Sequence, residues 1–321
     1  MFKAFAGWCA VAVAAVAPIL GYAQTYPTRT IKWIVPVPAG TSPDTTARVL
    51  AEKMGPSLGQ PIVVENIPGA GGNIGAGVAA KAPGDGYTWF FATSPMAVNM
   101  KLFKTPGYDA MKSFKHVSHI ADYDNVIVVN ANSPYKTLED LTAAIKKNPG
   151  KLNYSSGGLG TPTHIVPALM LKAIRGDAVH VPFKGGSESI NALLGGHVDF
   201  AVPVTQVGMN YVRSGQARAL AVSSANRNPI APDVPTLKEK GIAVTLVSFS
   251  GLSVPASTPP QVVARIDAAL KEALAKRDVV DQLTGLGLAV SPSTSEEFTR
   301  MVQDEITQAQ RTMAELGMEQ Q

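Results

Sequence analysis

Residues 34–44 read Ile-Val-Pro-Val-Pro-Ala-Gly-Thr-Ser-Pro-Asp, and they join an apolar segment to an amphipathic one through a short loop. Residues 31–37 are apolar apart from Lys32, which is typical of a strand buried on both faces of a parallel sheet. Ser42 followed by Pro43 predicts a helix start, because the N–H that proline lacks is unpaired at the first helical position anyway. The stretch therefore predicts a strand, a loop and a helix N-terminus, which together bind anions readily.

Two later segments repeat this pattern of strand, hydroxyl residue and proline. Residues 93–95 read Thr-Ser-Pro after a predicted strand at 88–92, and residues 161–162 read Thr-Pro after a strand at 152–154 and a loop of serine and glycine. Ligands of doubly wound sheets bind beyond the carboxyl ends of the strands, so the three loops are predicted to face one site. Their hydroxyls and free N–H groups suit the capture of a carboxylate without catalysis.

Predicted strands alternate with predicted helices along the whole chain, which indicates an α/β architecture with largely parallel sheets. Residues 125–130 and 244–254 are extended and apolar enough to cross between two lobes. We therefore predict that lobe 1 comprises residues 24–124 and 237–321 and that lobe 2 comprises residues 125–236. The C-terminal helices are then expected to pack on lobe 1.

The composition narrows the class of ligand. The chain has 321 residues, 45% of them hydrophobic, which is enough to bury the cores of two domains. The formal net charge is +4, and the 28 basic and 24 acidic residues are interspersed without a run. This distribution argues against nucleic-acid binding and favours small anionic ligands.

Residues 1–23 are predicted to be a secretory signal peptide, with Lys3 at its start, an apolar run at 10–20 and small residues at the cleavage positions. An uncleaved membrane anchor is disfavoured because Pro18 interrupts the run. The only cysteine, Cys9, lies inside the signal, so the mature protein is predicted to have no disulfide and no cysteine nucleophile. A lipid-anchored cysteine is also disfavoured, since most of the apolar run follows it.

The sequence patterns of catalysis and of metal or nucleotide binding are incomplete. Residues 185–189 carry serine where the last glycine of an esterase elbow must stand. The glycine-rich stretch 68–75 has Ile74 in place of a glycine of the dinucleotide fingerprint. His116 and His119 lack the helical pattern and the carboxylate motif of a metal site. We therefore predict no enzymatic activity, no metal and no cofactor.

Three polar residues near the predicted loops have two possible roles. Asp44 and Asp199 could act as paired carboxylates, but a structural role is favoured for both. Asp44, at the second position of the predicted helix, complements the helix dipole. Asp199 follows Gly195-Gly196 and is expected to cap or anchor a turn. Asn99 lies one turn into a predicted helix and could face either the same cleft or solvent.

Several blocks of the sequence match one known family. They include Leu58-Gly59-Gln60-Pro61, Pro68-Gly69-Ala70-Gly71-Gly72-Asn73-Ile74-Gly75, Asp85-Gly86-Tyr87-Thr88, Pro149-Gly150-Lys151-Leu152-Asn153-Tyr154, His180-Val181-Pro182-Phe183-Lys184-Gly185 and Pro232-Asp233-Val234-Pro235-Thr236. On these blocks, which are spread over essentially the whole mature chain, the sequence resembles the solute-binding proteins of tripartite tricarboxylate transporters, the TctC or Bug family.

The resemblance implies a type II periplasmic binding protein with two lobes, each a mainly parallel sheet flanked by helices. Such a receptor is expected to be a monomer that closes on a carboxylate and delivers it to membrane subunits of the TctA and TctB type. A periplasmic sensor that presents the ligand to a signalling partner remains the alternative. The expected ligand-binding residues are Gly40, Thr41, Ser42, Asp44, Thr93, Ser94, Asn99, Ser155, Ser156, Gly160, Thr161, Thr163, His164, Lys184, Gly185, Asp199, Val204 and Thr205.

The first loop departs from the family pattern. Members often have two consecutive glycines there, whereas this chain has Gly40 followed by Thr41. Thr41 adds a hydroxyl and bulk, which leaves the identity of the carboxylate open among dicarboxylates, amino acids, nicotinate-like acids and aromatic acids.

Overall fold

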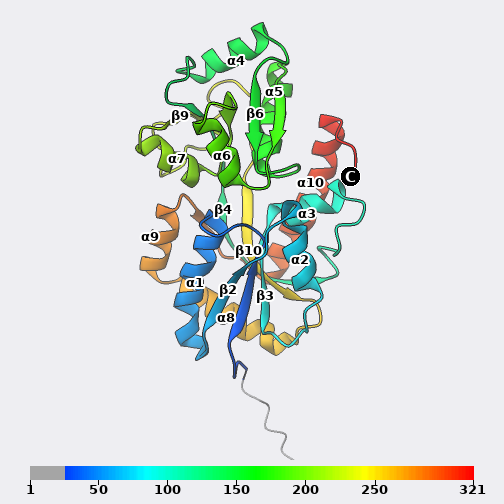
Figure 1. Cartoon of the computed structure of the whole chain (residues 1–321). Coiled ribbons are helices and arrows are strands. Elements are labelled where there is room, and N and C mark those ends of the chain that lie inside the picture. The colour runs from blue at the N-terminus through cyan, green and yellow to red at the C-terminus, as the bar shows by residue number, and fades with distance from the viewer. Residues whose placement is uncertain (1–25) are drawn as a thin grey trace, which may run out of the picture.

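The computed structural model describes residues 26–321, which form two α/β lobes (Figure 1). The predicted signal peptide and Cys9 lie outside the described residues. Within residues 26–321, no helix has both the length and the apolar character of a membrane span. The two-lobed α/β fold predicted from the sequence is confirmed.

Lobe 1 is built on a six-stranded sheet with the order β11-β4-β10-β3-β1-β2. Its strands are β1 (Ile31–Val35), β2 (Ile62–Asn66), β3 (Thr88–Thr93), β4 (Phe114–Tyr123), β10 (Ser248–Pro255) and β11 (Ala289–Val290). Its helices are α1 (Ser42–Leu58), η1 (Ala70–Gly72), α2 (Asn73–Ala80), α3 (Ser94–Leu102), α8 (Pro260–Leu274), α9 (Arg277–Gly285) and α10 (Ser295–Leu316). Alternate residues face opposite sides of a strand, so Trp33 packs with α1, α8 and α9 while Ile34 packs with α2, α3 and α10.

Lobe 2 is built on a five-stranded sheet with the order β7-β6-β8-β5-β9. Its strands are β5 (Val126–Asn130), β6 (Asn153–Ser156), β7 (Val179–Pro182), β8 (Phe200–Ala201) and β9 (Ala217–Val222). Its helices are α4 (Leu138–Lys147), α5 (Pro162–Ile174), α6 (Gly186–Leu194) and α7 (Thr205–Arg213). Helices α4 and α5 cover the face that carries Ile127 and Phe200, and α6 and α7 cover the face that carries Val128 and Ala201.

Both sheets are mixed rather than mainly parallel, which corrects the prediction. Strand β1 is parallel to β2 and β3, but β10 is antiparallel to both β3 and β4. In lobe 2, β6 is parallel to β7 and β8, but β5 is antiparallel to β8 and β9. Strands β5 and β10 are the ones that bring the chain from one lobe into the other. A strand buried on both faces is apolar throughout whatever its direction, so the sequence pattern could not show this.

The two crossings of the chain are both hydrogen-bonded to Ser223, the residue that follows β9. The amide of Asn125 donates to the Oγ of Ser223 at 3.0 Å, and the amide of Ser223 donates back to the carbonyl of Asn125 at 2.8 Å. The amide of Leu246 donates to the carbonyl of Ser223 at 2.9 Å. Because Leu237 and Val244 pack in the lobe 2 core, we propose that lobe 2 extends past residue 236 and that the chain returns near Leu246.

The C-terminal helix α10 is anchored to lobe 1 by a close approach to the central strand. A β-carbon at Gly251 would overlap the ring of Phe298, which is fully buried. At its other end α10 contacts α5 of lobe 2, where Lys172 and Glu315 lie 3.8 Å apart. Figure 1 shows α10 running from the lower lobe toward the upper one.

Candidate functional site

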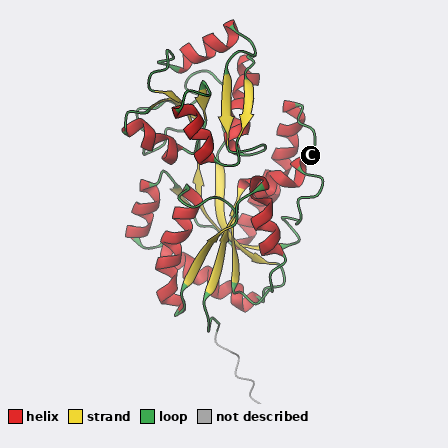
Figure 2. Cartoon of the chain, in the orientation of Figure 1, coloured by secondary structure: helices red, strands yellow, loops and turns green. Residues whose placement is uncertain are grey.

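A cleft of about 340 Å³ lies between the lobes. Figure 2 shows loops of both lobes, coloured green, facing each other in this region. Lobe 1 contributes the loops that follow β1, β2 and β3, and lobe 2 contributes those that follow β6, β7 and β8. Tyr123 ends β4 and Asn125 precedes β5, so both lie where the chain first passes from lobe 1 to lobe 2, between the two sets of loops. The cleft is therefore at the carboxyl ends of the parallel strands, where open α/β sheets bind ligands.

Six of the helices within residues 26–321 begin at this cleft, and none of the six has a side-chain N-cap hydrogen bond. Their N-cap residues are Thr41, Gly72, Thr93, Thr161, Gly185 and Val204. Of the four described α-helices that begin elsewhere, α4 and α10 carry complete capping boxes at Thr137 and Thr294. The first turn of a helix has N–H groups without intrahelical partners. At the cleft these groups are left for a ligand, and the helix dipoles add partial positive charge.

The side chains that line the cleft favour an anion. Among the described lining residues, Lys184 is the only charged one, and it is exposed. Ser42 and Asn125 line the cleft, and their side-chain oxygens are buried without a hydrogen-bond partner. Buried polar groups are normally paired. The Ser42 hydroxyl can donate to an anion, whereas the Oδ1 of Asn125 can only accept and suits a donor such as a ligand hydroxyl.

The cleft also has a side for a carbon skeleton. Tyr123, Ile190, Val207 and Tyr211 line it together with several prolines of the loops. Such a surface, next to a few convergent polar groups, is typical of a site for a small organic molecule.

Half of the predicted site residues line the cleft. These nine are Gly40, Thr41, Ser42, Thr93, Thr161, Thr163, Lys184, Gly185 and Val204. They come from both lobes, and most of them stand at or next to a helix start. The hydroxyl of Thr41 donates to the carbonyl of Pro38 at 2.8 Å, so the hydroxyl that departs from the family pattern braces its own loop.

Asp44 lies behind the first loop and holds it. Its carboxylate accepts hydrogen bonds from the amide of Gly40 at 2.8 Å and from the Nδ2 of Asn66 at 2.9 Å, and it pairs with Arg48. Burial alone would raise the pKa of Asp44, but the hydrogen bonds from Arg48, Gly40 and Asn66 lower it below its usual value. The carboxylate therefore stays ionised, and its partners are groups of lobe 1.

Asn99 and Ser94 also brace lobe 1 from behind the cleft. The Nδ2 of Asn99 donates to the carbonyl of Gly71 at 3.0 Å and to the Oδ1 of Asn73 at 2.7 Å, which fixes the glycine-rich loop. The Oγ of Ser94 accepts from the amide of Phe249 at 2.9 Å. These contacts join the loops after β2 and β3 to strand β10.

The remaining predicted residues of lobe 2 lie outside the lining. Ser155 is bonded to Ser189 in the core, and Asp199 accepts from the amide of Asn153 at the start of β6, opposite the cleft end of that strand. Thr205, at the start of α7, is buried, and its hydroxyl has no partner. Behind the loop that joins β6 to α5, Ser156 is hydrogen-bonded to Gly158 and His180, and Gly160 is hydrogen-bonded to His164.

Several lining residues were missed by the sequence reasoning. They are the glycines of the loop after β2, the crossing residues Tyr123 and Asn125, and one face of α7. Gln206, Val207, Asn210 and Tyr211 lie at i, i+1, i+4 and i+5, so they share that face. This spacing could have identified them once the start of α7 was placed at the cleft.

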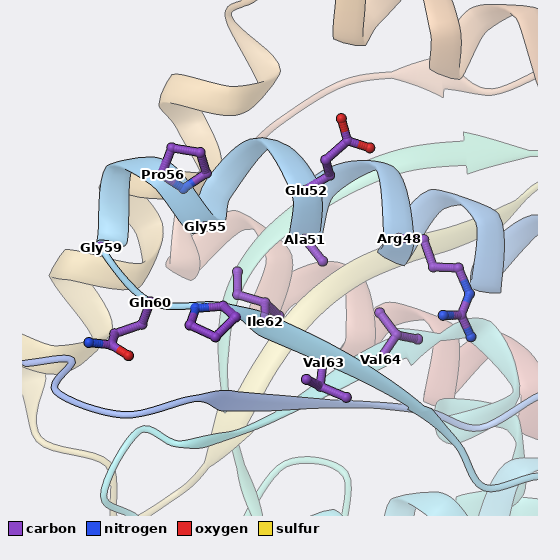
Figure 3. Close-up of a pocket in the computed structure, with 11 residues that line it drawn as sticks. Arg48, Ala51, Glu52, Gly55, Pro56, Gly59, Gln60, Ile62, Val63 and Val64 are labelled. Atoms are coloured by element: carbon purple, nitrogen blue, oxygen red, sulfur yellow. The ribbon is translucent and has the colours of Figure 1, made fainter.

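A second hollow, about 660 Å³ in volume, lies on the outer flank of lobe 1 (Figure 3). It is open, it is formed by one lobe only, and it runs beside strand β2 from Arg48 to the end of α1 at Gly59. The carbonyl end of a helix carries partial negative charge and repels anions. The guanidinium of Arg48 is already bonded to Asp44 and Asn66. The hollow therefore does not offer a carboxylate site comparable to the cleft.

Among the described residues, no three side chains of His, Cys, Asp or Glu are grouped so that they could hold a metal ion. We expect dialysis against EDTA to leave the affinity for a carboxylate ligand unchanged, because the cleft offers N–H groups and hydroxyls rather than metal ligands. Isothermal titration calorimetry before and after dialysis measures this. A loss of binding that added Mg²⁺ or Ca²⁺ restores would contradict the prediction.

Comparison with known proteins agrees with the two-lobed fold. Residues 46–318 match the family described as tripartite tricarboxylate transporter family receptor, TctC. This chain belongs to the TctC family. The resemblance predicted from the sequence blocks is thereby confirmed.

Three solved structures are among those to which this TctC-family chain is similar. The periplasmic binding protein BugD is 31% identical, with a TM-score of 0.87 over 92% of this chain and 100% of that one. MatC from Rhodopseudomonas palustris, solved with bound malate, is 29% identical, with a TM-score of 0.83 over 89% and 99% of the two chains. A protein of R. palustris solved with adipate is 27% identical, with a TM-score of 0.88 over 92% and 100%. The family is described as a receptor family and BugD as a periplasmic binding protein, and neither is an enzyme. The prediction that this chain has no enzymatic activity is thereby confirmed.

Proposed function

We propose that this TctC-family receptor captures an organic carboxylate between its lobes in the periplasm and delivers it to the membrane subunits of a tripartite tricarboxylate-type transporter. Two features of the cleft carry the proposal. Six helices begin there without side-chain caps, and the described lining residues include no carboxylate. The proposal includes export by the signal peptide at residues 1–23 and action as a monomer.

The arrangement of donors favours a ligand with two acidic groups. Helices α1, α2 and α3 begin on the lobe 1 side of the cleft, and α5, α6 and α7 begin on the lobe 2 side. A dicarboxylate can meet donors of both lobes at once and thereby stabilise the closed arrangement, as ligands do in hinged receptors. The malate and adipate bound by the two R. palustris neighbours are dicarboxylates. We therefore propose four- to six-carbon dicarboxylates as the first class to test.

A thermal-shift comparison of an acid with its methyl esters tests this function. A ligand at about 100 times its Kd stabilises the native state by about 2.7 kcal/mol, which raises the Tm of a chain of this size by roughly 5 to 10 °C. The dimethyl ester keeps the carbon skeleton but loses both charges, so it should give almost no shift. The monoester should lie between the two.

Succinate, malate and adipate with their methyl esters make a matched series. Chloride and sulfate salts at equal ionic strength control for general anion effects. Equal shifts from an acid and its dimethyl ester would contradict carboxylate recognition. Equal shifts from a dicarboxylate and its monoester would leave carboxylate capture intact but would overturn the two-ended arrangement.

A further inference from the structure

The loop that joins β6 to α5 has a conformation that glycine alone adopts without strain. Its φ angles are +125° at Gly158 and +72° at Gly160, both in the left-handed region. Glycines lose more backbone entropy on ordering than other residues. A loop of this kind therefore needs contacts that hold it, and Gly157, Thr161 and Thr163 of the same loop line the cleft.

Two histidines make contacts behind this loop. The amide of Gly160 donates to the Nδ1 of His164 at 3.2 Å. The Nε2 of His180, on the edge strand β7, lies 2.7 Å from the Oγ of Ser156, and that same oxygen accepts from the amide of Gly158 at 3.1 Å. Each histidine is thus linked, directly or through one hydroxyl, to one of the two left-handed glycines.

The hydrogen bond from Gly160 fixes the state of His164. A backbone N–H can only donate, so the Nδ1 of His164 must present a lone pair, and the ring carries its hydrogen on Nε2. A second proton would turn Nδ1 into a donor that faces the donor of Gly160. The contact therefore exists only while His164 is neutral.

The two imidazoles belong to a column of stacked rings. His164 lies on His180 with 4.2 Å between ring centroids and 16° between planes, and His180 lies on Tyr154 at 4.9 Å and 21°. Tyr154 in turn stacks on Phe200 of β8 at 5.3 Å. The column ties the loop to the core of lobe 2, and it leaves little room for one histidine to move without the other.

We propose that His164 and His180 are positioning residues for ligand binding: as a stacked pair they hold residues 156–163 in the conformation that presents Gly157, Thr161 and Thr163 to the cleft. The inference rests on the proposed function, because it assumes that the ligand binds against this loop. It assigns His164 a place behind the loop and not a contact with the ligand.

The column is neutral near pH 7. Burial lowers the pKa of His164 to about 4, with a further contribution from His180, and burial lowers the pKa of His180 to about 4. The other ionisable group in the column is Tyr154, and burial raises its pKa. Lys184, which follows β7, is exposed. Two imidazolium rings at this separation would repel each other strongly, so acid is expected to loosen the loop.

The test pairs two replacements of His164. Asparagine offers a side-chain oxygen near the place of Nδ1 and cannot take up a proton, whereas leucine keeps the volume but offers no acceptor. The affinity of a dicarboxylate found by thermal shift should fall about tenfold with His164→Leu, the typical effect of one lost buried hydrogen bond. His164→Asn should restore most of that loss. Its affinity should also decline less than that of the native protein as the pH falls from 5 toward 4, with the same ligand in both, so that protonation of the ligand cancels. His197→Asn, an exposed histidine outside the column, is the matched control and should change neither.

His180→Phe separates the two contributions of the second ring. Phenylalanine can stack between His164 and Tyr154 but cannot hydrogen-bond Ser156. We expect a loss of affinity smaller than that of His180→Ala, which removes both the stacking and the hydrogen bond. If His164→Leu and His180→Ala bind like the native protein, or if His164→Asn is as weak as His164→Leu, the positioning role is refuted.

Amide exchange in the protein without ligand gives a second readout. The Gly160 amide should be protected in the native protein and in His164→Asn, and it should exchange at least tenfold faster in His164→Leu, as followed in ¹H–¹⁵N spectra. This measurement needs no ligand, so it distinguishes the two proposals. Protection lost in His164→Leu together with no carboxylate binding by the native protein would refute the proposed function alone, whereas unchanged protection would overturn the positioning role.

Discussion

Replacing Gly160 by valine is expected to reduce the affinity for the carboxylate by about a hundredfold. The apparent affinity falls in proportion to the population of the closed state, and we expect that population to fall to about one in a hundred. A β-carbon at Gly160 would overlap the Cδ2 of Leu102. Gly160 belongs to the lobe 2 loop and Leu102 ends α3 of lobe 1, so the added side chain acts as a wedge between the lobes. Leu102 is fully buried and has little room to turn away.

Two variants separate the wedge from backbone strain. Gly196→Val adds a β-branched side chain at a φ of +73° where no atom lies within 4 Å of the β-carbon, so it reproduces the backbone strain without the clash at that carbon. It should leave affinity unchanged, whereas Gly160→Val combined with Leu102→Ala should recover part of the loss. Small-angle scattering of the ligand-saturated protein should show a larger radius of gyration for Gly160→Val. Native affinity in Gly160→Val, or lost affinity without expansion, would show that the lobes need not meet at this point.

Acidification from pH 6.5 to pH 4 is expected to destabilise the fold through the histidines whose pKa is lowered by burial, His116, His164 and His180. His116 lies in lobe 1, away from the stacked pair. Its Nε2 lies 3.0 Å from the carbonyl of Ala110 and its Nδ1 lies 2.9 Å from the Oγ of Ser253. Burial lowers the pKa of His116 to about 4, although the bond to Ala110 opposes this. The pKa in the unfolded chain is about 6.5. The contribution to stability is therefore complete above pH 6.5 and is lost as the pH falls through about 4, and for one such group it is about 3 kcal/mol.

Urea unfolding at pH 7, 5.5 and 4.5 measures this dependence. His116→Gln keeps a donor near the place of Nε2 and cannot be protonated. The free energy of unfolding of this variant should therefore fall less steeply with decreasing pH. Near pH 5 the two slopes should differ by about 1.4 kcal/mol per pH unit, which corresponds to one bound proton. Glu305 acts in the opposite sense, because burial raises its pKa to about 7 and stability is regained as it takes up a proton. Glu305→Gln should therefore be more stable than the native protein at pH 7.5. Parallel pH profiles of the native protein and His116→Gln would contradict the prediction.

The sequence predicted the helix starts at the cleft better than it predicted the direction of the side chains around them. Thr41, Thr93 and Thr161 follow apolar strands and precede proline, and this local pattern predicts a strand end and a helix start whatever the tertiary structure. Asp44 and Asn99 lie within two turns of such starts. A step of one residue turns a side chain by about 100° around a helix, so the sequence could not decide whether they faced a ligand or braced a loop.

The mixed sheets and the α7 face depended on tertiary structure in the same way. No local pattern shows that β10 enters the sheet antiparallel between β3 and β4, because both neighbours are distant in the sequence. Tyr123 and Asn125 reach the cleft only because the chain crosses between the lobes beside them. The sequence therefore predicted the backbone N–H groups that helix starts present to the cleft. It did not predict which side chains point into the cleft.

The position of β10 also sets an order of assembly. The strands of lobe 2 all lie between Val126 and Val222, so that sheet can form while the following part of the chain is still being made. Lobe 1 has a gap between β3 and β4 until residues 248–255 arrive. Bringing such distant strands together is slow when the intervening chain is loose. Once lobe 2 has folded, Ser223 holds Asn125 and Leu246 side by side, so the folded insert shortens the loop that β10 must close. The half that is synthesised second can therefore fold first and guide the half that was begun before it.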